Sequence, residues 1–493
     1  MKVLHDWLKH WDLPEPDSIA LVSGDTGESW NYRELFTRAQ SGANFLFHQK
    51  KIQKGDRVVY LGKNDLSVIT LFFATSRIGA ILVPVNFRLS HDEIHYIIND
   101  SLAKLIVMDS DIENLAGGFV SADQEVLFLK EFENQTQQKK EFIDFNCEEK
   151  DPAMIIYTSG TTGRPKGATL CYQGLFWNAL STSLRLNLTQ NDKAVTFLPL
   201  FHTGGWNVLT TPFLSRGAQI ILTQKFDAAQ VLSLSEKYQA TLLFGVPTTM
   251  SMLAQHSTFQ SVDLSSVRYA IVGGEPMPIE LIEKWHDKKV PVRQGYGLTE
   301  FGPNVFSLNE KESLRKMGSI GTPNAYIDVH VITDKNQAAL PGEVGELYLR
   351  GPACMLGYWN QPEETKKTMD GDWLMTGDLV QFDNEGFFYI VGRKKDMYKS
   401  GGENVYPAEV ERVILQISWV KEVAVIGMQN DKWGEVGKAF VSSDKSQFCE
   451  SELREHCSKN LAKFKVPQVF HWIRELPKSG SGKVLKRDLG TLR

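Results

Sequence analysis

Short apolar runs alternate with helical stretches through the first half of the chain, and this alternation constrains the fold more than any other feature. Residues 56–61 and 103–109 are strand-like, and residues 71–78 are helix-like before a further strand-like run at 80–84. Strands that alternate with helices are typical of α/β layers with mostly parallel strands. The sequence therefore predicts an α/β fold.

The pattern changes between residues 328 and 350. An apolar run at 329–333 precedes a Pro341–Gly342 turn and a second strand-like run at 345–350. Two such runs joined by a turn predict a β-hairpin region, which we expect to form a small β-barrel-like part of the large N-terminal domain.

A chain of 493 residues is too long for one ordinary core. A boundary near residues 392–396 predicts an N-terminal domain of residues 1–392 and a small, mobile α+β C-terminal domain of residues 393–493. The elements expected in the smaller domain are a helix that begins near Pro407, strands at 423–427 and 437–441, and a helix at 451–461.

Composition narrows the classes of partner and location. Lys and Arg number 54 and Asp and Glu number 59, so the net charge is −5, unlike the basic character of a nucleic-acid-binding protein. The five cysteines lack C-x-x-C spacing, which favours reduced thiols and a cytoplasmic location. The most apolar stretch, 68–87, contains Arg77, Gly79 and Pro84, so we expect a buried helix and a strand rather than a transmembrane segment. Peripheral membrane contact and a homodimer stay open.

A loop rich in glycine and hydroxyl groups follows the apolar run at 153–157. Residues 158–167 contain three glycines that let the backbone approach a ligand, four hydroxyl side chains and the cation of Lys166. Backbone N–H groups in such a loop form an anion-binding nest. A Walker A motif is excluded because Pro165 stands five residues after Gly160, and the alternative is a flexible surface turn. The predicted phosphate-binding residues are Thr158, Ser159, Gly160, Thr161, Thr162, Gly163 and Lys166.

Seven further motifs lie downstream of this loop. They are Leu-Pro-Leu-Phe-His at 198–202, Gly-Gly-Glu-Pro at 273–276, Gln-Gly-Tyr-Gly-Leu-Thr-Glu at 294–300, Thr-Gly-Asp at 376–378, Gly-Arg at 392–393, Lys-Ser-Gly-Gly at 399–402 and Gly-Lys at 482–483. In this order, the loop and the motifs resemble the signature of the adenylate-forming (AMP-binding) superfamily, which includes acyl-CoA synthetases, peptide-synthetase adenylation domains and beetle luciferases. The similarity covers almost the whole chain and is most like fatty-acid or related acid–CoA ligases.

The resemblance implies two half-reactions that use ATP, Mg²⁺ and coenzyme A. A carboxylate attacks the α-phosphorus of ATP to give an acyl-adenylate and pyrophosphate, and a thiol then attacks the activated carbonyl. Because the first step brings two anions together, charge neutralisation and positioning must dominate catalysis.

For the N-terminal motifs, the resemblance implies that the loop holds the β- and γ-phosphates, that Tyr296 stacks on adenine and that Thr299 contacts the α-phosphate. Glu300, with Thr158, would hold Mg²⁺, which prefers one or two carboxylates plus phosphate oxygens. Taken alone, Tyr296 has the alternative of a core aromatic and Glu300 that of a helix-capping carboxylate. The remaining nucleotide-binding residues implied are Gly273, Gly274, Glu275, Gln294, Gly295 and Gly297.

For the C-terminal motifs, the resemblance implies that Asp378 accepts both ribose hydroxyls and that Arg393 adds a second ribose or phosphate contact. Lys483 would meet the substrate carboxylate and the α-phosphate during adenylation, and Lys395 would be the hinge about which the C-terminal domain rotates between half-reactions. Taken alone, these residues are a turn aspartate, a surface arginine and solvated lysines. The residues implied near the thioester-forming site are Lys399, Gly401 and Gly402.

His202 is implied near the carboxylate or the acyl tunnel, and a packed histidine beside a loop is its alternative. Trp206 follows two glycines, and we hypothesise that it gates the acyl pocket.

The sequence thus predicts an AMP-forming acid–CoA ligase for a medium- or long-chain fatty acid or a related hydrophobic acid. A succinylbenzoate or aryl acid as substrate, and a carrier-protein thiol as acceptor, stay open as alternatives. A non-catalytic nucleotide-binding protein is disfavoured because the charged positions Lys166, Glu300, Asp378, Arg393 and Lys483 are all present.

Overall fold

The computed structural model describes residues 6–112, 124–142, 147–158, 164–478 and 484–490. The chain divides into two compact units, one of Met1–Val329 with Leu349–Leu374 and one of His330–Tyr348 with Met375–Arg493. It crosses from one unit to the other within strands β16 (Asp328–Ile332), β17 (Gly345–Arg350) and β20 (Trp373–Phe382). The predicted boundary at residues 392–393 concerns where the chain rotates, and it stays a prediction.

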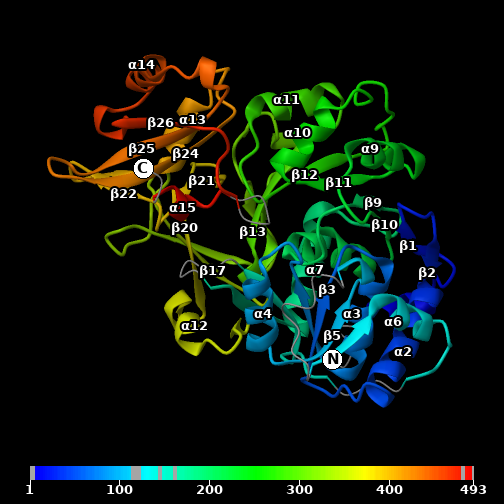
Figure 1. The fold of residues 1–493 in the computed structure, drawn as a ribbon. Helices are drawn as coiled ribbons and strands as arrows, with labels where there is room; N and C mark the ends of the chain where they lie inside the picture. The colour runs from blue at the N-terminus through cyan, green and yellow to red at the C-terminus, as the bar shows by residue number, and fades with distance from the viewer. Residues whose placement is uncertain (1–5, 113–123, 143–146, 159–163, 479–483, 491–493) are drawn as a thin grey trace. The chain divides into compact units, whose positions relative to one another are not determined.

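The first unit contains a seven-stranded sheet whose central pairs are parallel. Strands β8 and β18 extend one end of the sheet in antiparallel fashion. Figure 1 shows helix α4 (His91–Asp100) on one side of β3 and β5, and α2 (Tyr32–His48), α3 (Leu66–Ile78) and α6 (Leu129–Thr136) on the other. The strands, in sheet order, are β18 (Gly357–Tyr358), β8 (Lys166–Cys171), β7 (Pro152–Thr158), β4 (Ile81–Val85), β3 (Arg57–Leu61), β5 (Ala103–Met108) and β6 (Glu125–Phe128).

Helix α3 shows why the most apolar stretch of the sequence lies in the core. The Asp65 carboxylate accepts a hydrogen bond from the Ser67 N–H at 2.7 Å and caps the start of the helix. Gly79 ends the helix in the left-handed conformation, with φ of 78°. Every residue of α3 is buried, and β4 follows directly, as predicted. Among the described residues, no helix is long and apolar enough to cross a membrane.

The first unit also contains a nine-stranded sheet, parallel from β13 through to β1 and antiparallel at both ends. Helices α9 (Ala228–Lys237), α10 (Pro247–Gln255) and α11 (Ile279–Asp287) lie beside β11 and β12 in Figure 1 and cover a core that includes Phe259 and Trp285. The strands, in sheet order, are β15 (Thr322–Pro323), β14 (Gly302–Ser307), β13 (Val292–Leu298), β12 (Tyr269–Val272), β11 (Leu242–Gly245), β9 (Lys193–Thr196), β10 (Gln219–Leu222), β1 (Ile19–Ser23) and β2 (Ser29–Asn31).

The region predicted as a β-hairpin belongs to a five-stranded sheet. Strands β16, β17, β20 and β19 (Met369–Asp370) follow one another in this sheet, and β21 (Phe388–Arg393) pairs with β20. The other α-helices in the described part of the first unit are α1 (Trp7–Asp12), α7 (Tyr172–Leu186), α8 (Thr211–Ser215) and α12 (Pro362–Thr368).

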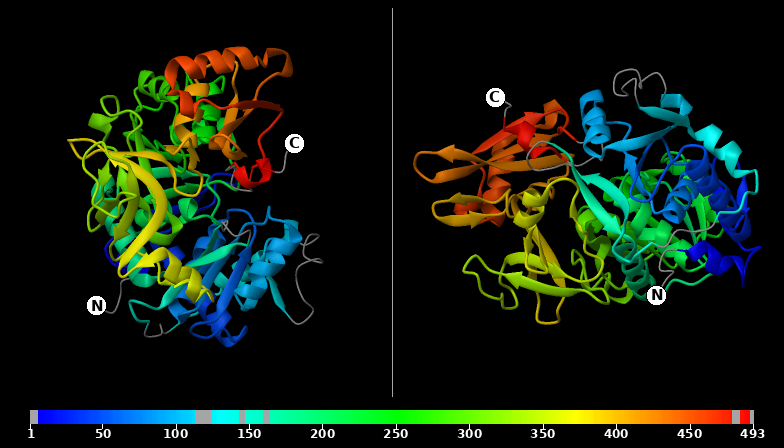
Figure 2. Two further views of the ribbon diagram at one scale, coloured as in Figure 1. Left: turned by 90° about the vertical axis from the view of Figure 1, so that its left-hand side faces the viewer. Right: turned by 90° about the horizontal axis from the view of Figure 1, so that it is seen from below.

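The C-terminal residues form an α+β arrangement, as predicted. A sheet in the order β23, β22, β25, β24, with β26 beside β25, packs its apolar face against helices, and β24 and β25 form the long orange hairpin of Figure 2. Its elements are β22 (Tyr398–Ser400), β23 (Glu403–Val405), α13 (Pro407–Ile414), β24 (Glu422–Asn430), β25 (Gly434–Ser442), α14 (Glu450–Asn460), β26 (Val469–Ile473) and α15 (Lys486–Leu489).

Candidate active site

The two ends of the predicted phosphate loop lie on adjacent antiparallel strands. Thr158 ends β7, Lys166 begins β8, and the two are register partners. The Thr158 hydroxyl donates to the Lys166 carbonyl at 3.4 Å. This pairing fixes the points where the loop leaves and rejoins the sheet. The predicted residues Ser159, Gly160, Thr161, Thr162 and Gly163 lie outside the described residues.

Lys166 is buried and has a carboxylate partner. Its side chain is 9% exposed, and its amine pairs with the carboxylate of Glu364 on α12. The other carboxylate oxygen of Glu364 accepts from Lys367 at 2.6 Å. Hydrogen bonds from Lys166 and then Lys367 lower the pKa of Glu364 to about 2, so this group is ionised at neutral pH. Lys166 is thus buried and paired, unlike the solvated lysine that a flexible surface turn would carry.

Glu300 connects to the same place through a tyrosine. The Tyr358 hydroxyl donates to the Glu300 carboxylate at 2.8 Å, and the Lys166 amine lies 5.3 Å from the centre of the Tyr358 ring. Glu300 sits in a short 3₁₀ turn, Thr299–Phe301, whose position is fixed by a hydrogen bond from the Met355 N–H to the Glu300 carbonyl at 2.8 Å. The predicted phosphate-binding lysine and the predicted metal-binding carboxylate therefore share one neighbour.

The predicted adenine-binding segments lie side by side. Val272, which precedes the Gly273–Glu275 motif, pairs with Gln294 in the parallel register of β12 and β13. Gln294 is 3% exposed, and its side-chain oxygen has no hydrogen-bond partner among the described residues. Gly274 has φ of 88° and is exposed, as is Glu275. The Gly273–Glu275 motif thus follows the end of β12 beside Gln294 of β13, and the role of the two motifs as walls of one site stays a prediction.

Tyr296 and its two flanking glycines are packed to different degrees. The Tyr296 ring packs edge-on against Phe306 with centroids 5.9 Å apart, and the side chain is half-buried. A Cβ atom on Gly297 would lie 2.2 Å from the backbone of Pro303, so only glycine fits where β13 and β14 approach. Gly295 has no such crowding, because its nearest neighbour would be 3.5 Å away. Tyr296 therefore contributes to packing through this T-shaped contact with Phe306.

The segment that carries His202 is held by two side chains. Asn64, 5% exposed, donates to the Leu198 and Thr223 carbonyls, both at 3.1 Å, and accepts from the Leu200 N–H at 2.9 Å. The Trp206 indole N–H donates to the Leu200 carbonyl. Both backbone polar groups of Leu200 are thus satisfied by side chains.

Trp206 is fully buried and packs on Phe72 with ring centroids 5.3 Å apart. It lies in a π-helical turn, Gly204–Thr210, and a Cβ on Gly205 would meet the Pro199 carbonyl oxygen at 2.2 Å. Trp206 is thus linked to residues 198–202 through its hydrogen bond to the Leu200 carbonyl. The hypothesis that it gates an acyl pocket stays a prediction.

In the second unit, Asp378 and Arg393 form an ion pair. They are register partners on β20 and β21, and the Arg393 Nε lies 2.6 Å from an Asp378 oxygen. Asp378 is 4% exposed, whereas the Arg393 side chain is 45% exposed. Next in the chain, Lys394 pairs with Glu346 at 2.7 Å, and Lys395 is exposed.

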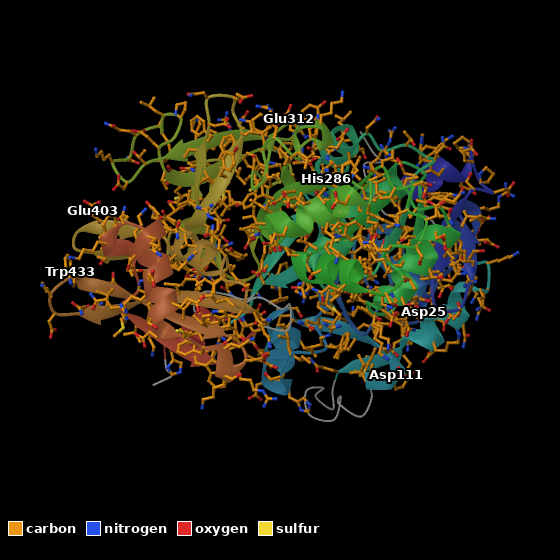
Figure 3. All side chains as sticks on the ribbon, turned by 90° about the horizontal axis from the view of Figure 1, so that it is seen from above. Asp25, Asp111, His286, Glu312, Glu403 and Trp433 are labelled. Atoms are coloured by element: carbon orange, nitrogen blue, oxygen red, sulfur yellow. The ribbon has the colours of Figure 1, made fainter. Side chains whose placement is uncertain are left out.

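The Lys399–Gly402 motif ends β22 and forms, with Gly401 and Gly402, the turn to β23. Gly401 and Gly402 both have positive φ, 61° and 86°, and the Gly401 N–H donates to the Trp433 carbonyl at 2.8 Å. Figure 3 shows Glu403 and Trp433 at the same edge of this unit. The Lys399 N–H donates to Glu435 at 3.0 Å. Lys483 lies outside the described residues, and its described flanks Lys478 and Val484 pair in an isolated antiparallel bridge.

Sequence reasoning missed three residues of this region: Asn64, Tyr358 and Glu364. Each acts on a motif far away in the chain, since Glu364 is 198 positions from Lys166 and Asn64 is 136 positions from Leu200. No local pattern marks such partners.

Comparison with known proteins decides the family. Residues 8–359 match the family described as AMP-binding enzyme, and residues 409–483 match the AMP-binding enzyme C-terminal domain. The chain belongs to the AMP-binding enzyme family. The predicted membership of the adenylate-forming superfamily is confirmed.

Relatives with similar identity differ in the acid they are named for. A feruloyl-CoA synthase of Amycolatopsis is 36% identical over 96% of both chains. The long-chain-fatty-acid–CoA ligase FadD13 of Mycobacterium tuberculosis is 35% identical over 99% of this chain and 98% of its own. The o-succinylbenzoate CoA synthetase of Bacillus subtilis, solved with its acyl-adenylate intermediate, is 31% identical with a TM-score of 0.91 and covers 99% of this chain and 98% of its own. The predicted fold, a large α/β part with a smaller C-terminal part, is confirmed by this likeness.

Proposed function

We propose that this member of the family is an ATP-dependent acid–CoA ligase that forms an acyl-adenylate and then an acyl-CoA thioester. The observation that carries the proposal is the link from Lys166 through Tyr358 to Glu300, because it puts a buried cation and a carboxylate around the end of one loop. Such a pair suits a polyphosphate and its counter-ion. The names of the relatives support coenzyme A as the acceptor.

In this proposal, the N-terminal motifs hold the nucleotide. Lys166 and the loop residues bind the β- and γ-phosphates, Thr299 contacts the α-phosphate, and His202 lies at the substrate carboxylate. Tyr296 stacks on adenine, and Gly273–Glu275 and Gln294–Gly297 form the walls of the adenine site. Cations and N–H groups fixed before the reaction lower the repulsion between carboxylate and triphosphate at no reorganisation cost.

Magnesium fits the oxygen donors present. Among the described residues, no group of three or more His, Cys, Asp or Glu side chains could hold a metal ion. One carboxylate, Glu300, and one hydroxyl, Thr158, would leave most positions to phosphate oxygens and water, as Mg²⁺ prefers. When bound, the ion would neutralise phosphate charge. The related B. subtilis enzyme has been solved with ATP and a magnesium ion.

The C-terminal motifs supply the ribose contacts and the second half-reaction in this proposal. Asp378 accepts the ribose hydroxyls, and Arg393, which pairs with its carboxylate, adds a second ribose or phosphate contact. Lys483 stabilises charge at the α-phosphate during adenylation, and the turn Lys399–Gly402 gives the pantetheine thiol room. Lys395 is the hinge.

The acid is proposed as a medium- or long-chain fatty acid or a related hydrophobic acid, with aryl acids and succinylbenzoate as alternatives. The relatives named for three different acids have nearly equal identity, which supports no single one.

A product assay tests the proposal. Purified chain is incubated with ATP, Mg²⁺, coenzyme A and one acid at a time, and AMP and thioester are measured. We expect AMP and acyl-CoA in equal amounts only when acid and coenzyme A are both present. Formation of ADP, or of AMP without any thioester, would contradict the proposal.

A further inference from the structure

The segment of β18 and α12, residues 357–368, holds both charged residues of the predicted phosphate site. Tyr358 contacts Glu300 and Lys166, and Glu364 contacts Lys166. Helix α12, yellow in Figure 1, begins with Pro362, so Glu364 lies in its first turn. The hydrogen bonds that Glu364 accepts from Lys166 and Lys367 hold its carboxylate in place.

The charges around Lys166 are already balanced. Glu364 uses one carboxylate oxygen for Lys166 and the other for Lys367. The Lys166 and Glu364 side chains are only 9% and 23% exposed, so water screens their attraction poorly. An ammonium so placed cannot give its full attraction to a phosphate while the carboxylate stays beside it.

We propose that Glu364 is a placeholder for nucleotide phosphate. The Glu364 carboxylate holds the Lys166 amine in the nucleotide-free chain. When nucleotide binds, a phosphate oxygen takes the place of this carboxylate beside Lys166. This inference rests on the proposed function. Lys367, one turn further along the same helix and 70% exposed, already pairs with Glu364 and offers the displaced carboxylate a partner in solvent. Glu364 is thus a positioning residue that sets nucleotide affinity by competition.

If Glu364 instead only fixes the position of Lys166, neutralising Glu364 is expected to change phosphate affinity in the opposite direction. If Glu364 only oriented Lys166, neutralising Glu364 would leave the Lys166 amine without a fixed position and would weaken phosphate binding. If Glu364 competes with phosphate, its neutralisation removes both the competitor and its repulsion of the incoming anion, and binding becomes tighter.

Calorimetric titration of the full chain with Mg-ATP, and separately with tripolyphosphate, distinguishes these roles. For Glu364→Gln we expect Kd to fall about tenfold for both ligands, which corresponds to about 1.4 kcal/mol. Glu364→Asp, which keeps the charge, should stay closer to the unsubstituted chain. Glu363→Gln on the same helix is the matched control, because Glu363 is exposed and carries the same charge; its Kd should not change.

Thermal unfolding of each variant shows whether it is folded, and Glu364→Ala serves if the glutamine variant is not. If the unsubstituted chain binds Mg-ATP and the folded Glu364 variant has an unchanged or higher Kd, Glu364 does not compete with phosphate. This result would overturn the placeholder role and would leave the proposed function unaffected. Absence of Mg-ATP binding by the unsubstituted chain would overturn both. In a Lys166→Met background, Glu364→Gln should no longer tighten binding, and an effect that persisted there would overturn the exchange at Lys166.

Discussion

At the residue scale, Lys166 has a partner that the sequence does not single out, whereas Asp378 and Arg393 are both singled out and pair with each other. Lys166 pairs with Glu364, and Asp378 pairs with Arg393. The residue types were predictable because a phosphate site needs cations and a carboxylate. The pairing of Lys166 was not, because Glu364 lies on a short helix whose position depends on the whole sheet.

The Lys166–Glu364 pair makes a pH-dependent contribution to stability. The pKa of Glu364 is lowered from 4.5 to about 2, so the pair stabilises the folded chain fully above pH 4.5 and less as pH falls from 4.5 toward 2. We expect the difference in unfolding temperature between the unsubstituted chain and Glu364→Gln to be constant from pH 7 to pH 5 and to shrink below. Thermal melts across this range measure it. A difference that grew on acidification would contradict the assignment.

At the element scale, periodicity served long segments well. Helix α3 and strands β3 and β5 lie within a few residues of their predicted places because each is a mostly apolar run, and helix α13 does so because it buries one apolar face. The segment 357–368 was missed because a two-residue strand and a seven-residue helix are too short to show a period. Its importance comes from contacts, which single-sequence patterns do not contain.

The loop 198–202 depends on Asn64. Asn64→Ala would leave the Leu200 N–H and the Leu198 and Thr223 carbonyls without this partner, and we expect it to destabilise the chain by about 3 kcal/mol. Urea unfolding measures this loss. Asn44→Ala is the control, because Asn44 makes one exposed hydrogen bond to the Glu141 carbonyl; it should change stability by less than about 0.5 kcal/mol. Equal losses would remove the special role of Asn64.

The turn between β22 and β23 offers a matched glycine pair. Both Gly401 and Gly402 have positive φ, but only at Gly401 would a Cβ approach the Trp433 ring, at 2.8 Å. We expect Gly402→Ala to cost about 1 kcal/mol in backbone strain and Gly401→Ala at least about 1 kcal/mol more. Chemical unfolding of the two variants compares them. Equal costs would show that Trp433 moves aside freely.

At the scale of the whole molecule, we propose that different motifs of one chain serve the two half-reactions: the nucleotide-binding motifs and Lys483 serve adenylation, and the Lys399–Gly402 motif serves thioester formation. The order of the motifs along the chain was enough to predict the family. Similarity to the relatives covers 96% or more of the chain, in agreement with that prediction. The acid could not be predicted, since the shape of an acyl pocket comes from side chains on separate strands and loops.

The assignment of Lys483 predicts unequal effects on the two half-reactions. Lys483→Ala should slow adenylation roughly a hundredfold or more, equivalent to about 3 kcal/mol, since it removes a cation from the α-phosphate in the transition state. Thioester formation from supplied acyl-adenylate should fall far less. Rapid-quench measurement of each step gives the two rates. Equal losses would contradict the division of labour.

The most direct test of the central claim is exchange of labelled pyrophosphate into ATP, measured without coenzyme A over a panel of fatty, aryl and succinylbenzoate-like acids. We expect exchange that requires both Mg²⁺ and one class of acid, because adenylation is reversible and precedes attack by the thiol. Absence of exchange with every acid, from folded chain that binds Mg-ATP, would contradict it.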